Sequence, residues 1–396
     1  MSEPRRAIIL ILDGVGCGAA PDAAGYGDAG SDTLGNLARA VGGLDLPNLE
    51  RLGLGRIAPL AGVSAVNAPG AAWGRMLPRS SGKDSTTGHW EIAGVLLKHP
   101  LPTWPDGFPK SVIAEFARRT GRDVLGNIAT SGTEALRRFG DEHRRTGAWI
   151  VYTSADSVFQ VAAHESVVPL AELYAACEAA LAMRLPVDDG EGPLVGRAIA
   201  RPFVGEAGAY TRTANRRDFS LAPPGETMLD ALAAAGIARA GVGKVDDLFA
   251  GRGIQSKHTA SNAEGVAEIL SWLEDRGGGL LFANLVDFDQ QYGHRNDAPG
   301  FYMALREFDA ALPELLSRLR QNDLLFITAD HGNDPTTPST DHARECVPLL
   351  AAGPAVVPID LGVRETFADL GATVAHWLGS DFRGAGVSFL PQLLQS

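Results

Sequence analysis

The amino-acid sequence predicts an α/β protein whose mostly parallel sheet is covered by helices, with a smaller α+β domain inserted into the chain. Short apolar runs that end abruptly in acidic residues, alternating with segments of helical periodicity, predict the sheet and its helices. Two proline-rich joints predict the insertion. With 396 residues, the chain is long enough for roughly two or three domains of about 100–200 residues each.

The predicted strands are three apolar runs, at residues 7–13, 280–289 and 324–330. Continuous apolar runs of this length suit strands that are buried on both faces, as in a parallel sheet covered by helices. Helical periodicity accompanies them at residues 261–277 and 301–321. Because ligand sites of such sheets gather beyond the carboxyl ends of the strands, the acidic residues that end all three runs are candidate site residues.

The inserted domain is expected at residues 99–224, between the stretches "HPLPTWPDGFPK" and "APPGE". Residues 1–98 and 225–396 then form one discontinuous core domain. An arginine-rich stretch inside the insertion, "GRAIARPFVGEAGAYTRTANRRD", is a candidate phosphate-binding segment, because the planar guanidinium group binds phosphate through two parallel hydrogen bonds. A solvated basic face is the alternative for some of its five arginines, which are Arg197, Arg201, Arg212, Arg216 and Arg217.

Composition excludes several classes of partner. The 35 basic and 47 acidic residues give a net charge of −12, which repels nucleic acid and anionic membrane surfaces, so an anionic substrate needs a local basic pocket. The opening apolar run, which Asp13 ends, is too short for a signal peptide or a membrane span. Cys17, Cys177 and Cys346 share no motif, which indicates a reducing compartment. We therefore expect a cytoplasmic protein, with Cys346 in its core rather than at a metal.

Three segments combine Asp and His near predicted strand ends: "LVDFDQQYGH", "ADHGND" and "TDH". Asp and neutral His are ligands of Mn²⁺, Zn²⁺ and Fe. A single Asp–His pair is usually a cap or a surface hydrogen bond, but three such segments together with Asp13 favour metal. Six ligands divide into two sets of three, which is the two-metal arrangement of phosphoryl transfer.

Spacing within these segments predicts their local structure. Asp330 and His331 are adjacent, so both reach one region only where the strand ends and the chain turns. Asp289 and His294 are five apart, a poor pairing for an α-helix, so we expect a loop there. Spacing alone does not decide between Asp287 and Asp289 as the ligand.

The stretch "GKDSTTGHWE" places three hydroxyl groups, those of Ser85, Thr86 and Thr87, before a predicted helix. Metal coordination lowers the pKa of an alcohol and makes it a nucleophile, and a helix start favours phosphate. A helix cap is the ordinary alternative for Ser85.

Long blocks of the sequence resemble the phosphopentomutase family of the alkaline-phosphatase-like superfamily. They are "DGVGCGAAPDAAGYGDAGSDTLGN", "GKDSTTGHWEIAG", "YTSADSVFQVAAHE", "RPFVGEAGAYTRTANR", "NLVDFDQQYGHR" and "ITADHGNDPTTPSTDHARECVPLL". The resemblance implies an alkaline-phosphatase-like core with an inserted cap domain. It also implies interconversion of ribose 1-phosphate and ribose 5-phosphate, and of the deoxy forms, usually with two Mn²⁺ ions.

Matched position by position, the resemblance assigns one metal to Asp13, Asp330 and His331, and the other to Asp289, His294 and His342. Asp287 then supports the ligands without binding metal. The nucleophile, normally threonine, matches Ser85, which departs from the family pattern and leaves Thr86 and Thr87 as alternatives.

The remaining matches concern the substrate. Ser154 and Asp156 match positions that contact the sugar, whereas Arg197, Arg212 and Lys244 match positions that face the distal phosphate. The implied reaction passes through phosphorylated Ser85 and a 1,5-bisphosphate, and a sugar bisphosphate such as glucose 1,6-bisphosphate primes the enzyme. A phosphatase or a metal-dependent phosphoglycerate mutase of the same superfamily is the nearest alternative. A metal- or phosphate-binding protein without catalysis is the alternative from another class.

Overall fold

A computed structural model of the chain describes residues 4–154, 157–188, 190–275 and 277–394. The chain divides into two compact units, one formed by Met1–Lys98 with Pro223–Ser396 and the other by His99–Ala222. The expected insertion was residues 99–224, so the two sets of boundaries differ by two residues at the carboxyl end. No helix in the described part of the chain is long and apolar enough to cross a membrane.

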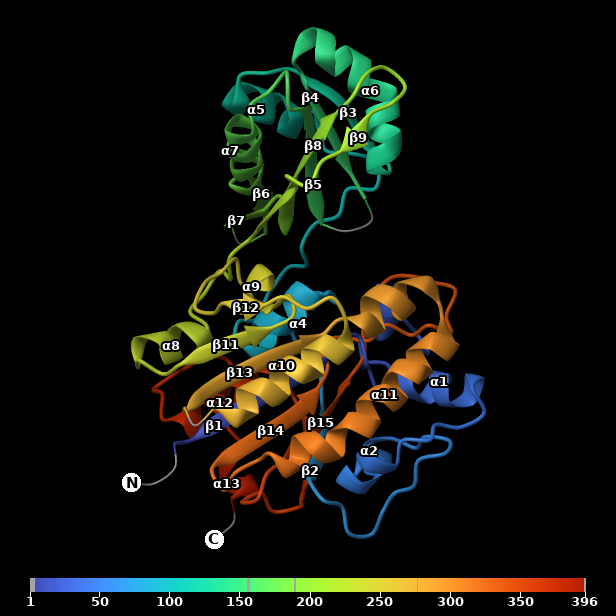
Figure 1. The fold of residues 1–396 in the computed structure, drawn as a ribbon, viewed down its shortest axis with the longest axis vertical. Helices are drawn as coiled ribbons and strands as arrows, with labels where there is room; N and C mark the ends of the chain where they lie inside the picture. The colour runs from blue at the N-terminus through green and yellow to red at the C-terminus, as the bar shows by residue number, and fades with distance from the viewer. Residues whose placement is uncertain (1–3, 155–156, 189, 276, 395–396) are drawn as a thin grey trace. The chain divides into compact units, whose positions relative to one another are not determined.

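Described residues of the first unit form an eight-stranded, mostly parallel sheet with the strand order β12-β11-β13-β1-β14-β15-β2-β16 (Figure 1). Among the described strands of this sheet, only the pairings of β15 with β14 and with β2 are antiparallel. In chain order, the strands are β1 (Arg6–Leu12), β2 (Ala72–Met76), β11 (Arg239–Val242), β12 (Ser256–Lys257), β13 (Gly279–Leu285), β14 (Asp323–Thr328), β15 (Val347–Ala352) and β16 (Asp360–Arg364). The predicted fold class is confirmed.

The three apolar runs become the adjacent strands β13, β1 and β14, and every residue of each strand is buried. Parallel pairing places Ile11 of β1 beside Asn284 of β13 and Thr328 of β14. The three carboxyl ends therefore coincide at one edge of the sheet. The acidic residues that follow these strands are brought together by this register.

Helices cover both faces of this sheet. The helices α10 and α11 lie in front of it in Figure 1, whereas α12 contacts β1, α4 and α8 behind it. The helices of the first unit are α1 (Thr33–Ala40), α2 (Pro47–Leu52), α3 (Leu54–Ile57), α4 (Ser85–Ile92), α8 (Met228–Ala234), α9 (Val245–Leu248), α10 (Asn262–Glu274), α11 (Ala298–Ser317), α12 (Ala368–Leu378) and α13 (Leu390–Leu393). The short helical turns are η1 (Ala23–Tyr26), η2 (Phe288–Tyr292) and η3 (Gly293–Arg295).

The second unit has its own mixed sheet, in which the described strands follow the order β10-β8-β5-β4-β3 and β9 pairs with β8. Its strands are β3 (Val124–Ala129), β4 (Trp149–Thr153), β5 (Val158–His164), β8 (Arg197–Val204), β9 (Thr211–Arg212) and β10 (Arg217–Ser220), with a separate hairpin of β6 (Arg184–Val187) and β7 (Gly190–Pro193). One apolar cluster packs this sheet against α5 (Lys110–Thr120) and α7 (Leu170–Leu181), and a second packs it against α6 (Gly132–Thr146). The unit thus has a core of its own.

Candidate active site

The three hydroxyl residues of "GKDSTTGHWE" have different surroundings at the start of α4. Asp84 is the N-cap, and its carboxylate accepts hydrogen bonds from the backbone N–H of Thr87 at 3.0 Å and from Thr87 Oγ1 at 2.6 Å. The capping role considered for Ser85 therefore belongs to Asp84, and the hydroxyl of Thr87 is committed to that cap. Ser85 is left as the first helical residue, with its hydroxyl available.

Ser85 is buried, and its Oγ atom lies among charged groups from distant parts of the chain. It lies 3.1 Å from His331 Nε2 and 3.5 Å from Asp13 Oδ1, and it accepts a hydrogen bond from Lys244 Nζ at 3.3 Å. Lys244 Nζ also lies 2.8 Å from Asp13 Oδ2. An alcohol held between carboxylate, imidazole and ammonium groups at a helix start has the surroundings of a nucleophile.

A first group of potential metal ligands consists of Asp13, Asp330 and His331, whose ligand atoms all lie within 4.8 Å of one another. His331 Nε2 is 3.2 Å from Asp13 Oδ1 and 3.5 Å from Asp330 Oδ2. Asp330 Oδ1 accepts a hydrogen bond from the backbone of Gly14 at 3.2 Å, whereas Asp330 Oδ2 is buried and accepts none from the described residues. A buried carboxylate oxygen without a hydrogen bond is an expected feature of a metal ligand.

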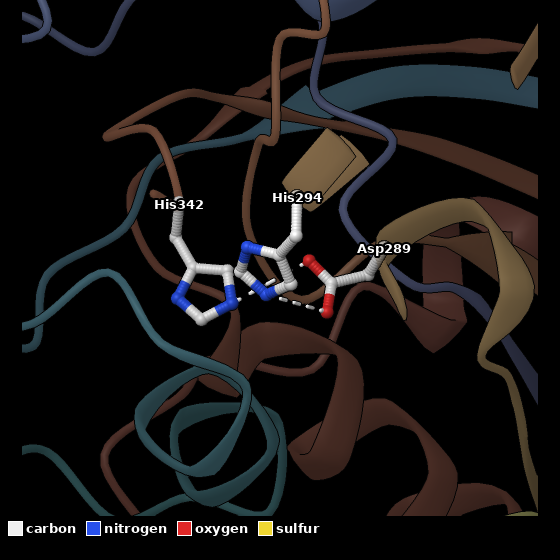
Figure 2. Close-up of side chains that lie close together, drawn as sticks. All are labelled: Asp289, His294 and His342. Carbon is white, nitrogen blue, oxygen red and sulfur yellow. Dashed lines mark ion pairs between the residues drawn. The ribbon is translucent and has the colours of Figure 1, made fainter. Parts of the chain in front are cut away.

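A second group consists of Asp289, His294 and His342, whose ligand atoms also lie within 4.8 Å of one another. Figure 2 shows both imidazole rings pointing toward the carboxylate of Asp289. His294 Nε2 is 3.2 Å from Asp289 Oδ2, and His342 Nε2 is 3.4 Å from Asp289 Oδ1. Asn333 Nδ2 donates a hydrogen bond to Asp289 Oδ1 at 2.7 Å and holds this carboxylate in place.

The expectation of a loop between Asp289 and His294 is wrong. The segment forms a π-helical turn, η2, followed by the 3₁₀ turn η3. Asp289 belongs to the π-helical turn and His294 to the 3₁₀ turn that follows it, and the two successive turns bring the side chains together. Asp287 lies outside both groups, since its carboxylate accepts from the backbone of Asn262 at 2.7 Å at the start of α10. Cys346 is buried and also lies outside them.

The groups perturb one another's protonation. Burial alone raises the pKa of Asp13, but Lys244 and His331 outweigh it and hold that pKa below its usual value. The hydrogen bond to Asp289 raises the pKa of His294 to about 9. Burial alone lowers the pKa of His331, but Asp330 and Asp13 outweigh it and raise that pKa to about 10. The carboxylates thus favour positive charge on the groups around them, as they would favour a divalent cation.

Histidine orientation tests whether these residues suit a metal. His331 and His294 each turn Nε2 toward the carboxylates and Nδ1 toward a backbone carbonyl, that of Gly332 at 3.0 Å and that of Thr340 at 2.6 Å. Metal-binding histidines have this arrangement, in which one nitrogen donates to an acceptor and leaves the other as the ligand. The rings of His331 and His342 lie 4.2 Å apart, so the two groups adjoin. The residues present fit two neighbouring divalent cations.

Comparison with known proteins agrees with this geometry. A family model described as the metalloenzyme superfamily matches residues 5–381. The phosphopentomutase of Desulfitobacterium hafniense (strain DSM 10664 / DCB-2) is 53% identical over 394 residues, covering 98% of this chain and 100% of the relative. The phosphopentomutase of Anaeromyxobacter sp. (strain K) is 56% identical over 393 residues, covering 98% and 99%. The chain belongs to the phosphopentomutase family.

Membership of the phosphopentomutase family makes the chain an enzyme of the isomerase class. Among solved structures, the PH0037 protein from Pyrococcus horikoshii is similar, with a TM-score of 0.52, 17% identity and coverage of 97% of this chain and 100% of that one. At that identity the likeness concerns the fold alone, and it agrees with the alkaline-phosphatase-like architecture.

The family residues expected to contact the substrate fall in both units. Lys244 belongs to the first unit and lies beside Ser85, whereas Arg197 and Arg212 belong to the second unit. Ser154 follows β4 and is half-buried, while Asp156 lies outside the described residues. Arg212 pairs through β9 with Phe203, six residues beyond Arg197 on β8, which corresponds to about 20 Å of strand.

The arginines that lie near Arg212 are Arg201 and Arg216 rather than Arg197. Together with Arg201 and Arg216, Arg212 lines a hollow of about 190 Å³ in the second unit. A Cβ atom at Gly132, the first residue of α6, would lie 2.8 Å from the Tyr152 hydroxyl and 3.5 Å from Arg212 Nη1. Guanidinium groups, a phenol and a helix N-terminus thus face one region, which suits a phosphate group.

Sequence reasoning missed the buried carboxylate of Glu345. It accepts hydrogen bonds from the backbone N–H and the hydroxyl of Thr33, both at 2.9 Å, and from the backbone of Gly18 at 3.2 Å. Burial raises its pKa to about 8. Glycines at positions 16 and 332 are the signal that could have found it, because a Cβ at either position would lie within 2.5 Å of this side chain. Glu345 ties together the loops that follow Asp13 and His331.

Proposed function

We propose that the chain interconverts ribose 1-phosphate and ribose 5-phosphate, and the deoxy forms, through a phosphorylated Ser85. The observation that carries the proposal is the position of Ser85 Oγ, 3.1 Å from His331 Nε2 and 3.3 Å from Lys244 Nζ. Membership of the phosphopentomutase family supports the choice of substrate.

We assign one Mn²⁺ to Asp13, Asp330 and His331 and another to Asp289, His294 and His342. When bound, two divalent cations supply charge neutralisation for the phosphoryl group and for both the attacking and the departing oxygen. The chain's own residues set the geometry. Asn333 holds the carboxylate of Asp289, and the carbonyls of Gly332 and Thr340 orient the imidazoles of His331 and His294.

The reaction begins with phosphate on Ser85, which a sugar bisphosphate such as glucose 1,6-bisphosphate provides. The free hydroxyl of a ribose monophosphate attacks this phosphorus, the Ser85 Oγ–P bond breaks, and ribose 1,5-bisphosphate forms. Ser85 Oγ then attacks the other phosphate, and the isomeric monophosphate leaves. Lys244 Nζ is placed to donate to Ser85 Oγ and to the transferring phosphoryl oxygens, where donors lower the barrier most.

The second unit holds the rest of the substrate in this proposal. Arg212, with Arg201 and Arg216, takes the phosphate that is not reacting, and Ser154 and Asp156 contact the sugar. The family resemblance implies a cap domain, and exclusion of water by such a domain would protect phosphorylated Ser85 from hydrolysis.

A coupled assay with Mn²⁺ and glucose 1,6-bisphosphate tests the function, with ribose 1-phosphate and 3-phosphoglycerate as competing substrates. We expect turnover of the pentose phosphate. Turnover of 3-phosphoglycerate alone would assign the chain to the phosphoglycerate mutase activity instead, and release of inorganic phosphate as the main product would assign it to the phosphatases. Mass spectrometry of the bisphosphate-treated enzyme should find phosphate on Ser85, and phosphate on Thr86 or Thr87 would move the nucleophile.

A further inference from the structure

His89 lies one turn after Ser85 on α4 and is fully buried. Its ring stacks on Phe282 of β13, with ring centroids 5.4 Å apart and an interplanar angle of 17°. Gly88 precedes it, and a Cβ at that position would lie 2.1 Å from the backbone oxygen of Asp330. The absence of a side chain at position 88 therefore lets α4 approach the end of β14 closely enough for the His89 ring to reach a ligand of the first group.

The Nδ1 atom of His89 faces two oxygen atoms. The carbonyl oxygen of Ser85 lies 2.9 Å away, and Asp330 Oδ2 lies 3.1 Å away. A ring nitrogen facing two acceptors carries a proton, so this N–H donates to the Ser85 carbonyl and turns its positive edge toward Asp330. On the other side of the ring, Nε2 faces Asn284 Nδ2 at 3.3 Å. The ring is thus fixed by stacking and by contacts at both nitrogens.

We propose that His89 is a positioning residue that sets the orientation of the Asp330 carboxylate relative to Ser85, and thereby the affinity of the first group for a divalent cation. One N–H edge contacts both the residue that carries the nucleophile and a ligand of the metal beside it. Asp289, His294 and His342 have no contact with His89 among the described interactions, so the second group is independent of it. The inference rests on the proposed metal-binding role of the first group.

The expected size of the effect follows from the way the carboxylate is held. Asp330 Oδ1 is fixed by the backbone of Gly14, while His89 supplies the N–H edge facing Oδ2. Without that edge, His331 Nε2, at 3.5 Å, is the remaining nitrogen near Oδ2, and rotation of the Asp330 carboxylate becomes easier. Loss of a group that orients a metal ligand typically costs about 10–100-fold in metal affinity.

Mn²⁺ titration of the metal-free enzyme by calorimetry tests the inference in two matched backgrounds. In Asp289→Ala only the first group remains, and adding His89→Phe should weaken binding by about 10–100-fold. In Asp330→Ala only the second group remains, and adding His89→Phe should leave binding unchanged. Phenylalanine keeps the stacking on Phe282 but has no N–H.

A conservative pair separates positioning from packing. In the Asp289→Ala background, His89→Asn places an amide N–H near the position of Nδ1 and should restore part of the affinity. His89→Gln carries its amide one bond further and should not. Equal affinity with and without His89→Phe, or equal loss for Asn and Gln, would overturn the proposal. Failure of the wild-type chain to bind Mn²⁺ would instead refute the proposed metal centre itself.

Discussion

Replacing Lys244 with methionine separates its effect on the metal from its effect on the transferred phosphoryl group. Lys244 Nζ lies 2.8 Å from Asp13 Oδ2 and 3.3 Å from Ser85 Oγ. Burial alone lowers the pKa of Lys244, but the carboxylates of Asp13, Asp289 and Asp330 outweigh it and raise that pKa, so the ammonium is charged at neutral pH. Methionine keeps most of the side-chain volume and removes the charge.

The substitution is expected to raise the Mn²⁺ affinity of the first group and to lower the rate of phosphoryl transfer. At 2.8 Å, the ammonium and the Asp13 carboxylate attract by about 6 kcal/mol at an effective dielectric constant of about 20, before the desolvation that opposes it. If a quarter of this attraction competes with metal, Lys244→Met raises the Mn²⁺ affinity of the first group by about tenfold. Loss of the donor at Ser85 Oγ slows phosphoryl transfer by about 10²–10³-fold, or roughly 3–4 kcal/mol.

Two measurements on one variant check this reasoning. Calorimetric titration of the metal-free enzyme gives the Mn²⁺ affinity, and rapid-quench assay at saturating Mn²⁺ gives the rate of Ser85 phosphorylation by glucose 1,6-bisphosphate. Tighter metal binding with slower phosphorylation is expected. A variant that binds Mn²⁺ more weakly, or that is phosphorylated at the wild-type rate, would refute the assignment of Lys244 to the transferring group.

Three further predictions concern other parts of the chain. Ser85→Ala should abolish phosphoenzyme in a radiolabelling assay while two Mn²⁺ still bind, and Thr87→Val should remain phosphorylated; the reverse would exchange their roles. Arg212→Ala should raise KM for ribose 5-phosphate with a smaller change in kcat. The increase in KM should exceed that of Arg197→Ala, because Arg212 lines the arginine hollow and Arg197 does not. Equal increases in KM would contradict the assignment of that hollow as the phosphate site. Burial lowers the pKa of His143 from 6.5, so the folded chain binds fewer protons than the unfolded chain, and this contribution to stability is present above pH 6.5 and lost as the pH falls below it. His143→Asn should flatten the pH dependence of urea unfolding between pH 7 and 5, and an unchanged slope would count against it.

The sequence predicted the parts of the site that depend on strand ends. Asp13, Asp289 and Asp330 follow apolar runs that are easily recognised as buried parallel strands, and the ends of such strands meet at one edge. Family resemblance divided the histidines into the same two groups of side chains that lie together in the structure. The sequence did not distinguish Ser85 from Thr87, and in the structure Asp84 binds the Thr87 hydroxyl whereas Ser85 Oγ lies beside His331 and Lys244.

Other features depend on packing that has no periodic signal. The π-helical turn at Phe288–Tyr292 was expected as a loop, since spacing of five fits no common helix. His89 reads as an ordinary helical residue, and its contact with Asp330 joins positions 241 residues apart. In the sequence Glu345 is one of many charged residues, although it is buried and accepts hydrogen bonds from Gly18 and Thr33. Long-range side-chain contacts of this kind become visible only when the strand order is known.

The central place of β1 in the sheet has a consequence for biosynthesis. Its apolar segment Arg6–Leu12 leaves the ribosome long before β13 and β14, its two neighbours in the order β13-β1-β14. At about 5–20 residues per second, roughly 13–50 s separate the synthesis of Leu12 from that of Gly279, the first residue of β13. Throughout this interval the apolar segment lacks the two strands that bury its edges in the folded protein. We therefore expect ribosome-associated chaperones to bind it. The candidate active site, likewise, can form only when translation is nearly complete, because it includes Asp330, His331 and His342.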